Sequence, residues 1–180
     1  MTADWTDSAI ETRAIHAGQD PDPTTGAVIP PIYQTSTYVQ EAVGVHKGYE
    51  YSRTDNPTRT ALQQMIASLE GGDWALAYAS GLAATQNLTY LLAPGDHILL
   101  SDDAYGGTYR LIAKVVSRYG VDFSLVDMAD LDAVRAALRP ETRLVWVETP
   151  TNPYLKIVDI RGVADVLTDH SAKLVVDNTF

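Results

Sequence analysis

The sequence contains no cysteine. A disulfide, a thiolate metal ligand and a catalytic thiol are therefore excluded within this chain, and the composition suits a reducing compartment, so we expect a cytoplasmic protein and no metal site. Positive charge is scarce too, because 13 Lys and Arg residues face 23 Asp and Glu residues, for a formal net charge of -10. Nucleic acids and anionic membranes attract clustered positive charge, so neither is expected as a partner. The expected partners are therefore small molecules and further copies of the chain.

Long apolar runs are also missing. No stretch approaches the roughly 20 apolar residues that a membrane-spanning helix needs. The first eleven residues carry three acidic side chains and lack the basic start and apolar stretch of a signal peptide. With 180 residues, of which 46% are hydrophobic, the chain can still bury a sizeable core. We therefore expect one large domain or part of one.

Residues 1–57 look irregular and are interpreted as an arm. Residues 20–26 form a cluster of turn-forming residues, and Pro30-Pro31 is incompatible with a helix interior. A regular pattern begins at Asn56, a suitable N-cap that is followed by proline, and apolar residues recur at helical spacing up to Gly71-Gly72. The pattern predicts a helix between these two points.

From residue 58 onward, strand-like apolar runs alternate with helical patterns. The strand-like runs are at 75–79, 98–100, 123–126, 144–147 and 174–176, and the helical patterns are at 83–92, 110–119, 131–138 and 163–167. Such alternation is typical of an α/β fold, in which a mainly parallel sheet carries helices on both faces. Residues 58–180 are therefore interpreted as the first part of one large domain.

Polar clusters follow several of the predicted strands, at the sheet edge where ligands of such folds bind. Ser80-Gly81 is a small-residue turn at the start of a predicted helix, where free backbone amides make an anion site. The turn lacks the Lys-Ser/Thr ending of a P-loop and the three glycines of a dinucleotide site, so an isolated phosphate fits better than a nucleotide. The alternative is a turn that only connects two elements.

Three further loops each hold one side chain suited to a flat, charged ligand. Tyr105, beside Gly106-Gly107, can stack on a ring or serve as an ordinary turn aromatic. Asn152, within the segment 148–153, can donate to a ring oxygen or bond locally in a rigid turn. Asp177 ends the last apolar run and can pair with a protonated pyridine nitrogen or cap the following turn.

Tyr51 and Arg53 stand just before the helix that is predicted to begin after Asn56. An arginine forks onto phosphate oxygens and a tyrosine hydroxyl adds a hydrogen bond, although a surface arginine is more often simply solvated. Because both residues end an arm with little core of its own, we expect them to serve a neighbouring subunit.

Together these segments resemble the Cys/Met-metabolism family of pyridoxal-phosphate enzymes from about Thr12 to Phe180. The matching segments are Thr12-Arg13-Ala14-Ile15-His16-Ala17-Gly18, Pro30-Pro31-Ile32-Tyr33-Gln34-Thr35-Ser36-Thr37, Tyr51-Ser52-Arg53, Asn56-Pro57-Thr58, Ser80-Gly81, Tyr105-Gly106-Gly107, Glu148-Thr149-Pro150-Thr151-Asn152-Pro153 and Val176-Asp177-Asn178-Thr179-Phe180. So many matches in the same order are not expected by chance.

The resemblance implies a fold-type I, aspartate aminotransferase-like large domain that binds pyridoxal 5'-phosphate in a homotetramer of two active dimers. Asp177 would pair with the ring nitrogen, Tyr105 would stack on the ring, and both would be catalytic. The residues that the resemblance assigns to the cofactor are Tyr51, Arg53, Ser80, Gly81, Leu82, Tyr105, Asn152, Asp177 and Thr179. Tyr51 and Arg53 would reach the phosphate in the adjacent subunit.

The family's Schiff-base lysine lies in a Ser-X-Thr-Lys segment downstream of the aspartate, and this chain ends before it. We therefore interpret the chain as the first part of a longer polypeptide.

Two charged residues narrow the range of substrates that the resemblance implies. Glu50 precedes Tyr51, and Arg110 closes the segment after Tyr105, as in family members that handle cystathionine. They could bind its distal ammonium and carboxylate groups, or be plain surface charges. The resemblance favours a cystathionine γ-lyase, with cystathionine γ-synthase close behind. Methionine γ-lyase, homoserine sulfhydrylase and a non-catalytic binding or assembly module remain as alternatives.

Overall fold

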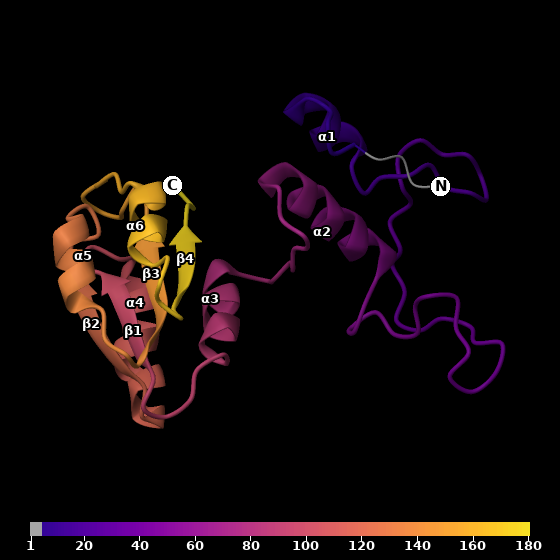
Figure 1. The fold of residues 1–180 in the computed structure, drawn as a ribbon. Coiled ribbons are helices and arrows are strands. Elements are labelled where there is room, and N and C mark those ends of the chain that lie inside the picture. The colour runs from indigo at the N-terminus through magenta and orange to yellow at the C-terminus, as the bar shows by residue number, and fades with distance from the viewer. Residues whose placement is uncertain (1–4) are drawn as a thin grey trace. The chain divides into compact units, whose positions relative to one another are not determined.

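The computed structural model describes residues 5–180 and divides the chain into two compact units, one ending at Tyr78 and the other beginning at Ala79 (Figure 1). The first unit holds two helices in otherwise irregular chain. The second holds a parallel sheet covered by helices. The predicted role of residues 1–57 in a neighbouring subunit stays a prediction.

Helix α2 (Pro57–Glu70) of the first unit lies where the sequence predicts it. The Asn56 side chain accepts a hydrogen bond of 2.9 Å from the backbone N–H of Thr58, which satisfies one of the free donors at the helix start. Pro57 takes the first helical position, where no donor is needed. Gly71 ends the helix with a left-handed φ of 66°. The predicted helix is confirmed.

A second helix, α1 (Ile10–His16), lies in the region that the sequence predicts to be irregular, so the prediction was wrong for these residues. A helix this short depends on packing more than on propensity, and α1 contacts α2. Arg13 donates a hydrogen bond of 2.5 Å to the Ser68 carbonyl of α2. Beyond the helix, a Cβ at Gly18 would lie 2.7 Å from the carbonyl oxygen of Ala61, so this contact requires glycine.

The second unit is built on a four-stranded sheet in the order β2-β1-β3-β4, and all its strand pairs are parallel. Its strands are β1 (His97–Ser101), β2 (Asp122–Val126), β3 (Thr142–Glu148) and β4 (Lys173–Asp177). Its helices are α3 (Gly81–Thr89), α4 (Gly106–Lys114), the 3-10 helix η1 (Val116–Tyr119), α5 (Leu131–Ala137) and α6 (Ile160–Val166). Between residues 5 and 180, no helix combines the length and apolar character needed to cross a membrane.

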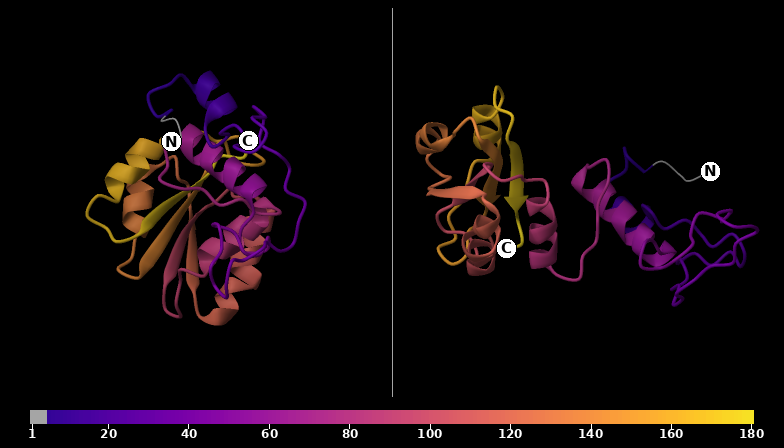
Figure 2. Two further views of the ribbon diagram at one scale, coloured as in Figure 1. Left: turned by 90° about the vertical axis from the view of Figure 1, so that its right-hand side faces the viewer. Right: turned by 90° about the horizontal axis from the view of Figure 1, so that it is seen from below.

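Each face of the sheet has its own core, as Figure 2 helps to follow. On one face, Leu100 and Trp146 pack with Ile112 of α4. On the other, Leu99 and Val145 pack in a cluster that includes residues of α5 and α6. Because neighbouring residues of a strand point to opposite faces, strands buried on both faces are apolar along their length. The predicted α/β architecture is confirmed.

Residues 75–79, predicted as a strand, form none. The backbone N–H of Ala77 donates to the Gln63 side chain at 3.0 Å instead of to a ladder. Leu76 and Tyr78 are 54% and 40% exposed. A strand is stabilised by pairing and by burial of its side chains, and this segment has neither in the described structure. The prediction of a strand here was wrong.

Candidate active site

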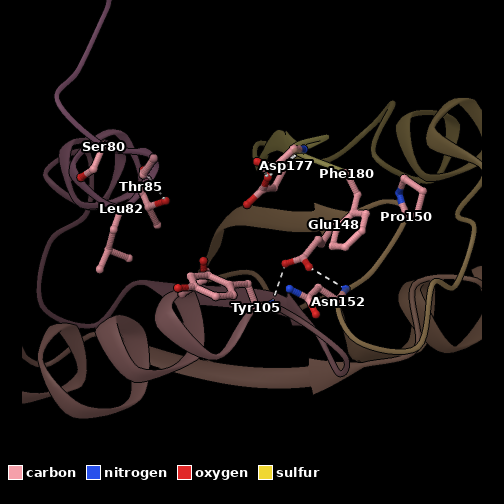
Figure 3. Close-up of a pocket in the computed structure, with 12 residues that line it drawn as sticks. Ser80, Leu82, Thr85, Tyr105, Glu148, Pro150, Asn152, Asp177 and Phe180 are labelled. Atoms are coloured by element: carbon pink, nitrogen blue, oxygen red, sulfur yellow. Dashed lines mark hydrogen bonds between the residues drawn. The ribbon is translucent and has the colours of Figure 1, made fainter.

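A cavity of about 350 Å³ lies at the carboxyl ends of the sheet strands in the second unit, beside the start of α3 (Figure 3). Its lining residues are Ser80, Gly81, Leu82, Thr85, Tyr105, Thr108, Glu148, Pro150, Asn152, Asp177, Thr179 and Phe180. This set includes every residue of the second unit that the resemblance assigns to the cofactor. The structure thus brings these residues together, while their individual roles stay predictions.

The start of α3 presents free donors to the cavity. Ser80 caps the helix, and its hydroxyl oxygen accepts from the backbone N–H of Ala83 at 3.2 Å. The N–H groups of Gly81 and Leu82 have no acceptor within the described part of the chain. A Cβ placed at Gly81 would meet no atom within 4 Å, so the space beside this backbone is open. An anion can therefore approach these amides and the positive end of the helix dipole.

Asp177 is the last residue of β4 and is held by the turn that follows it. Its Oδ1 atom accepts from the Thr179 hydroxyl at 2.6 Å and from the Thr179 N–H at 3.2 Å. Asp177 therefore also caps the following turn, which was the alternative interpretation of this residue. The Oδ2 atom accepts no hydrogen bond from the described residues, and Figure 3 shows the carboxylate on the cavity wall. One oxygen orients the group while the other remains available to a cationic ligand.

Tyr105 lies just before α4, and its ring is 48% exposed. A Cβ at Gly107 would overlap the Tyr105 ring, so the ring occupies space that only glycine leaves open. The side-chain amide of Asn152 forms no hydrogen bond within the described chain, which leaves it free to donate into the cavity. The local bond that was the alternative for this side chain is therefore not made.

Glu148 is a site residue that the sequence interpretation did not single out. It ends β3, pairs in register with Asp177 and is only 4% exposed. Its Oε2 atom accepts from the Tyr105 N–H at 2.6 Å, and its Oε1 atom accepts from the Asn152 N–H at 2.8 Å. Burial raises the pKa of the Glu148 carboxyl above its ordinary value; the two N–H groups oppose this effect, and the nearby Asp177 adds to it.

Strand alternation could have identified Glu148. Residues 144, 146 and 148 share one face of β3, and register places residue 148 beside residue 177. An acidic residue at the end of such a buried strand is a signal in itself, because burying an unpaired carboxylate is costly.

Among the remaining predicted residues, Arg110 belongs to the second unit and does not line the cavity. Glu50, Tyr51 and Arg53 belong to the first unit, where the Arg53 guanidinium lies 5.0 Å from the centre of the Tyr51 ring. Arg110 is exposed on α4. Their predicted contacts with phosphate and substrate are untested.

A protein-family model described as Cys/Met metabolism PLP-dependent enzyme matches residues 11–180. The chain belongs to this family. Pyridoxal phosphate is accordingly its expected cofactor, because the family consists of PLP-dependent enzymes of cysteine and methionine metabolism.

Relatives within the Cys/Met metabolism family carry more than one activity in their names. The chain is 58% identical to a probable cystathionine γ-synthase of Herpetosiphon aurantiacus, over 97% of this chain and 54% of that protein. It is 52% identical to a cystathionine β-lyase of Coxiella burnetii, over 96% of this chain and 45% of that protein. The chain thus spans about half the length of the curated relatives it matches.

Two solved structures share the fold of this family member. The structure of metB from Corynebacterium glutamicum matches 99% of this chain and 47% of its own, with a TM-score of 0.96 and 49% identity. Cystathionine γ-lyase from Lactobacillus plantarum, complexed with L-serine, matches 94% of this chain and 44% of its own, with a TM-score of 0.90 and 46% identity. The fold is therefore that of the fold-type I PLP-dependent enzymes, as the resemblance implied.

Proposed function

We propose that this chain forms the pyridoxal-phosphate site of a cystathionine γ-synthase, which joins cysteine to the γ-carbon of an activated homoserine. The observation that carries the proposal is the cavity that gathers the predicted cofactor residues of the second unit. The choice of γ-synthase is supported by relatives of that name at 58% identity, compared with 52% for the Coxiella β-lyase.

Cystathionine γ-lyase is the second candidate. It is supported by the likeness to the Lactobacillus plantarum enzyme and by the presence of Glu50 and Arg110, whose opposite charges suit the distal ammonium and carboxylate groups of cystathionine. Formation and cleavage of the γ carbon–sulfur bond need the same recognition of that end, so the two candidates share one proposed substrate-binding pair.

The chemistry of the cavity fits pyridoxal phosphate group by group. The open amides of Gly81 and Leu82 suit the phosphate, and Asp177 suits the ring nitrogen, where it would hold a proton. The Asn152 amide suits the ring oxygen. When bound, pyridoxal phosphate supplies an electron sink beside the α-carbon of the substrate.

Tyr105 has two proposed tasks in this site. Its ring would cover one face of the cofactor and exclude water from it, since an aromatic face stacks on a flat ring. Its hydroxyl would pass a proton to the leaving group, a general-acid role that a positioned tyrosine can fill. Replacement by Phe separates the tasks, because Phe keeps the ring and removes the hydroxyl.

We further propose that Tyr51 and Arg53 bind the cofactor phosphate of an adjacent subunit in a cytoplasmic homotetramer. Mixing Arg53→Ala subunits with Asp177→Ala subunits of the full-length protein tests this directly. If the arm acts across the interface, one site in each mixed dimer is intact, and about a quarter of wild-type activity returns on random pairing. If it acts within its own subunit, every site carries a lesion, and the mixture shows no more than the average of the two variants' own activities.

The reaction is tested on the full-length protein supplied with pyridoxal phosphate. Cystathionine formed from an O-acylhomoserine and cysteine supports γ-synthase. Cysteine and 2-oxobutyrate released from L-cystathionine would move the assignment to γ-lyase, whereas homocysteine and pyruvate would move it to β-lyase. No product in any of these assays would overturn the trans-sulfuration proposal.

A further inference from the structure

The side chain of Glu148 ties together the two loops that face the cavity from β1 and β3. Glu148 receives the backbone N–H of Tyr105 on one carboxylate oxygen and that of Asn152 on the other, at 2.6 and 2.8 Å. Figure 3 shows both bonds as dashed lines that converge on the carboxylate. We propose that Glu148 is a positioning residue that fixes Tyr105 and Asn152 relative to each other, and so sets the width of the cofactor cavity. This inference deepens the proposed function and rests on its cofactor site.

The geometry of the bonds gives Glu148 this role. Residues 105 and 152 are far apart in sequence, so the position of one loop does not by itself determine the position of the other. A carboxylate has two acceptor atoms a fixed distance apart, so a bond to each amide sets the separation of the two loops. Bonds from N–H groups to an ionised carboxylate are stronger than neutral ones, which makes the tie stiff.

Burying the Glu148 carboxylate costs free energy, and the hydrogen bonds to the two loops explain why a carboxylate stands here. The side chain is almost completely buried, and no basic side chain of residues 5–180 forms an ion pair with it or with Asp177. Burial raises the pKa of this carboxyl. An apolar residue of similar size would avoid the cost of burying the carboxylate. The buried carboxylate instead holds two backbone amides, and both belong to residues with proposed cofactor contacts.

A second buried carboxylate in the same region provides the matched control. Asp103 follows β1, is 7% exposed and also ties the two loops, through the Thr151 hydroxyl at 2.5 Å and the Tyr154 N–H at 3.1 Å. It contacts the amides of neither Tyr105 nor Asn152. Loss of Asp103 therefore reports what general loosening of the loops does, without loss of the specific tie.

The test compares Glu148→Gln and Asp103→Asn with wild type in the full-length protein. Glutamine has nearly the same size as glutamate but keeps only one acceptor oxygen. Its amide nitrogen faces the second backbone N–H and cannot accept from it, so one of the two hydrogen bonds is lost. In the cofactor-free protein, we expect amide hydrogen exchange at Tyr105 or Asn152 to accelerate about tenfold in Glu148→Gln alone. The dissociation constant of pyridoxal phosphate, followed by absorbance, should rise about tenfold in Glu148→Gln and less than about twofold in Asp103→Asn.

Two outcomes overturn the proposal. One is unchanged exchange and affinity in Glu148→Gln, and the other is an equal loss of affinity in both variants, which would mean that any loosening has the same effect. If Glu148→Gln does not fold, Glu148→Asp replaces it, because the shorter side chain keeps the charge but cannot reach both amides. Failure of the wild-type protein to bind the cofactor would instead count against the proposed function, while the exchange measurement would still decide the role of Glu148.

Discussion

The two compact units of this chain bury their apolar residues to very different extents. In the second unit, Leu99 and Val145 are completely buried, and each face of the sheet carries its own cluster. In the first unit, Ile32 is 84% exposed and Val39 is 91% exposed. Since burial of apolar surface is the main stabilising term in folding, the second unit is held by its own core. The first unit depends more on the contact between α1 and α2, on the Asn56 cap and on local hydrogen bonds.

The largest expected effect comes from truncating one leucine in each unit, one in a core and one on a helix surface. Leu99→Ala should lower the free energy of unfolding by about 3 kcal/mol, because it leaves a cavity in a closely packed core. Leu62→Ala in α2 should cost about 1 kcal/mol or less, because Leu62 is 45% exposed. With Trp5 and Trp74 replaced by Phe, urea unfolding followed by the fluorescence of the buried Trp146 reports on the second unit, while far-ultraviolet circular dichroism follows the loss of helices in both units. Equal costs at the two positions would contradict the contrast between the units.

The next effect concerns the cofactor contact that we propose for Asp177 of the second unit. Asp177→Asn should weaken pyridoxal-phosphate binding about 100-fold in the full-length protein, because a carboxylate that pairs with a protonated ring nitrogen is replaced by a neutral amide. Asp169→Asn removes an exposed acidic residue of the same unit and serves as the control. Titration followed by absorbance measures both, and similar affinities in the two variants would remove Asp177 from the site.

A smaller effect is expected from the phosphate contact that we propose for Arg53 of the first unit. Arg53→Ala should weaken cofactor binding about tenfold, since the loss is one charge-assisted bond to phosphate. Arg59→Ala is the matched control, because Arg59 lies in the same unit and pairs with Asp55 at 3.5 Å. Raising the salt concentration should narrow the difference between wild type and Arg53→Ala, because salt screens a partly exposed charge. A loss in both variants alike would point to disturbance of the arm as a whole.

The smallest effect is a difference in acid sensitivity. His97 is buried between the hydroxyls of Thr142 and Ser124, and burial lowers its pKa from 6.5. The unfolded chain therefore binds a proton that the folded chain resists, and stability present above pH 6.5 is lost as the pH falls below it. The loss should be at most about 1 kcal/mol over the first pH unit, and His97→Asn should abolish this slope.

The first unit should lose stability only in stronger acid. Hydrogen bonds from Thr25 lower the pKa of Asp22 from 3.8, so its contribution is present above that value and is lost below it. Far-ultraviolet circular dichroism and Trp146 fluorescence, recorded across the two pH ranges, separate the transitions. Loss of the first unit near pH 6.5 would contradict the assignment.

Sequence patterns whose physical cause is local, such as helix caps and apolar runs, were sufficient to predict much of this fold. Asn56 and Gly71 marked the ends of α2 because capping depends on residues next to each other in sequence. The strands of the sheet were predicted by short apolar runs, and those of the central strands β1 and β3 are buried along almost their whole length. Helix α1 was missed because its stability depends on α2, which lies far along the chain. Residues 75–79 failed as a strand because strand formation depends on a pairing partner that sequence patterns do not reveal.

The residues that line the cavity were predicted more completely than the residues that hold them in place. Residues that would touch a ligand, such as Tyr105 and Asp177, were predicted from their chemistry and from the resemblance. Glu148 was missed because its role depends on register with β4 and on amides from two other loops. Such relations exist only after the strands have assembled.

The parallel register of β3 and β4 has a consequence for how a ligand enters. Glu148 and Asp177 form one negatively charged wall, while the open amides of α3 form a positive pole on the same cavity. The cavity is therefore an electric dipole before anything binds. A molecule with an anionic tail and a basic ring is turned by this field as it approaches, so that its two ends arrive in the correct order.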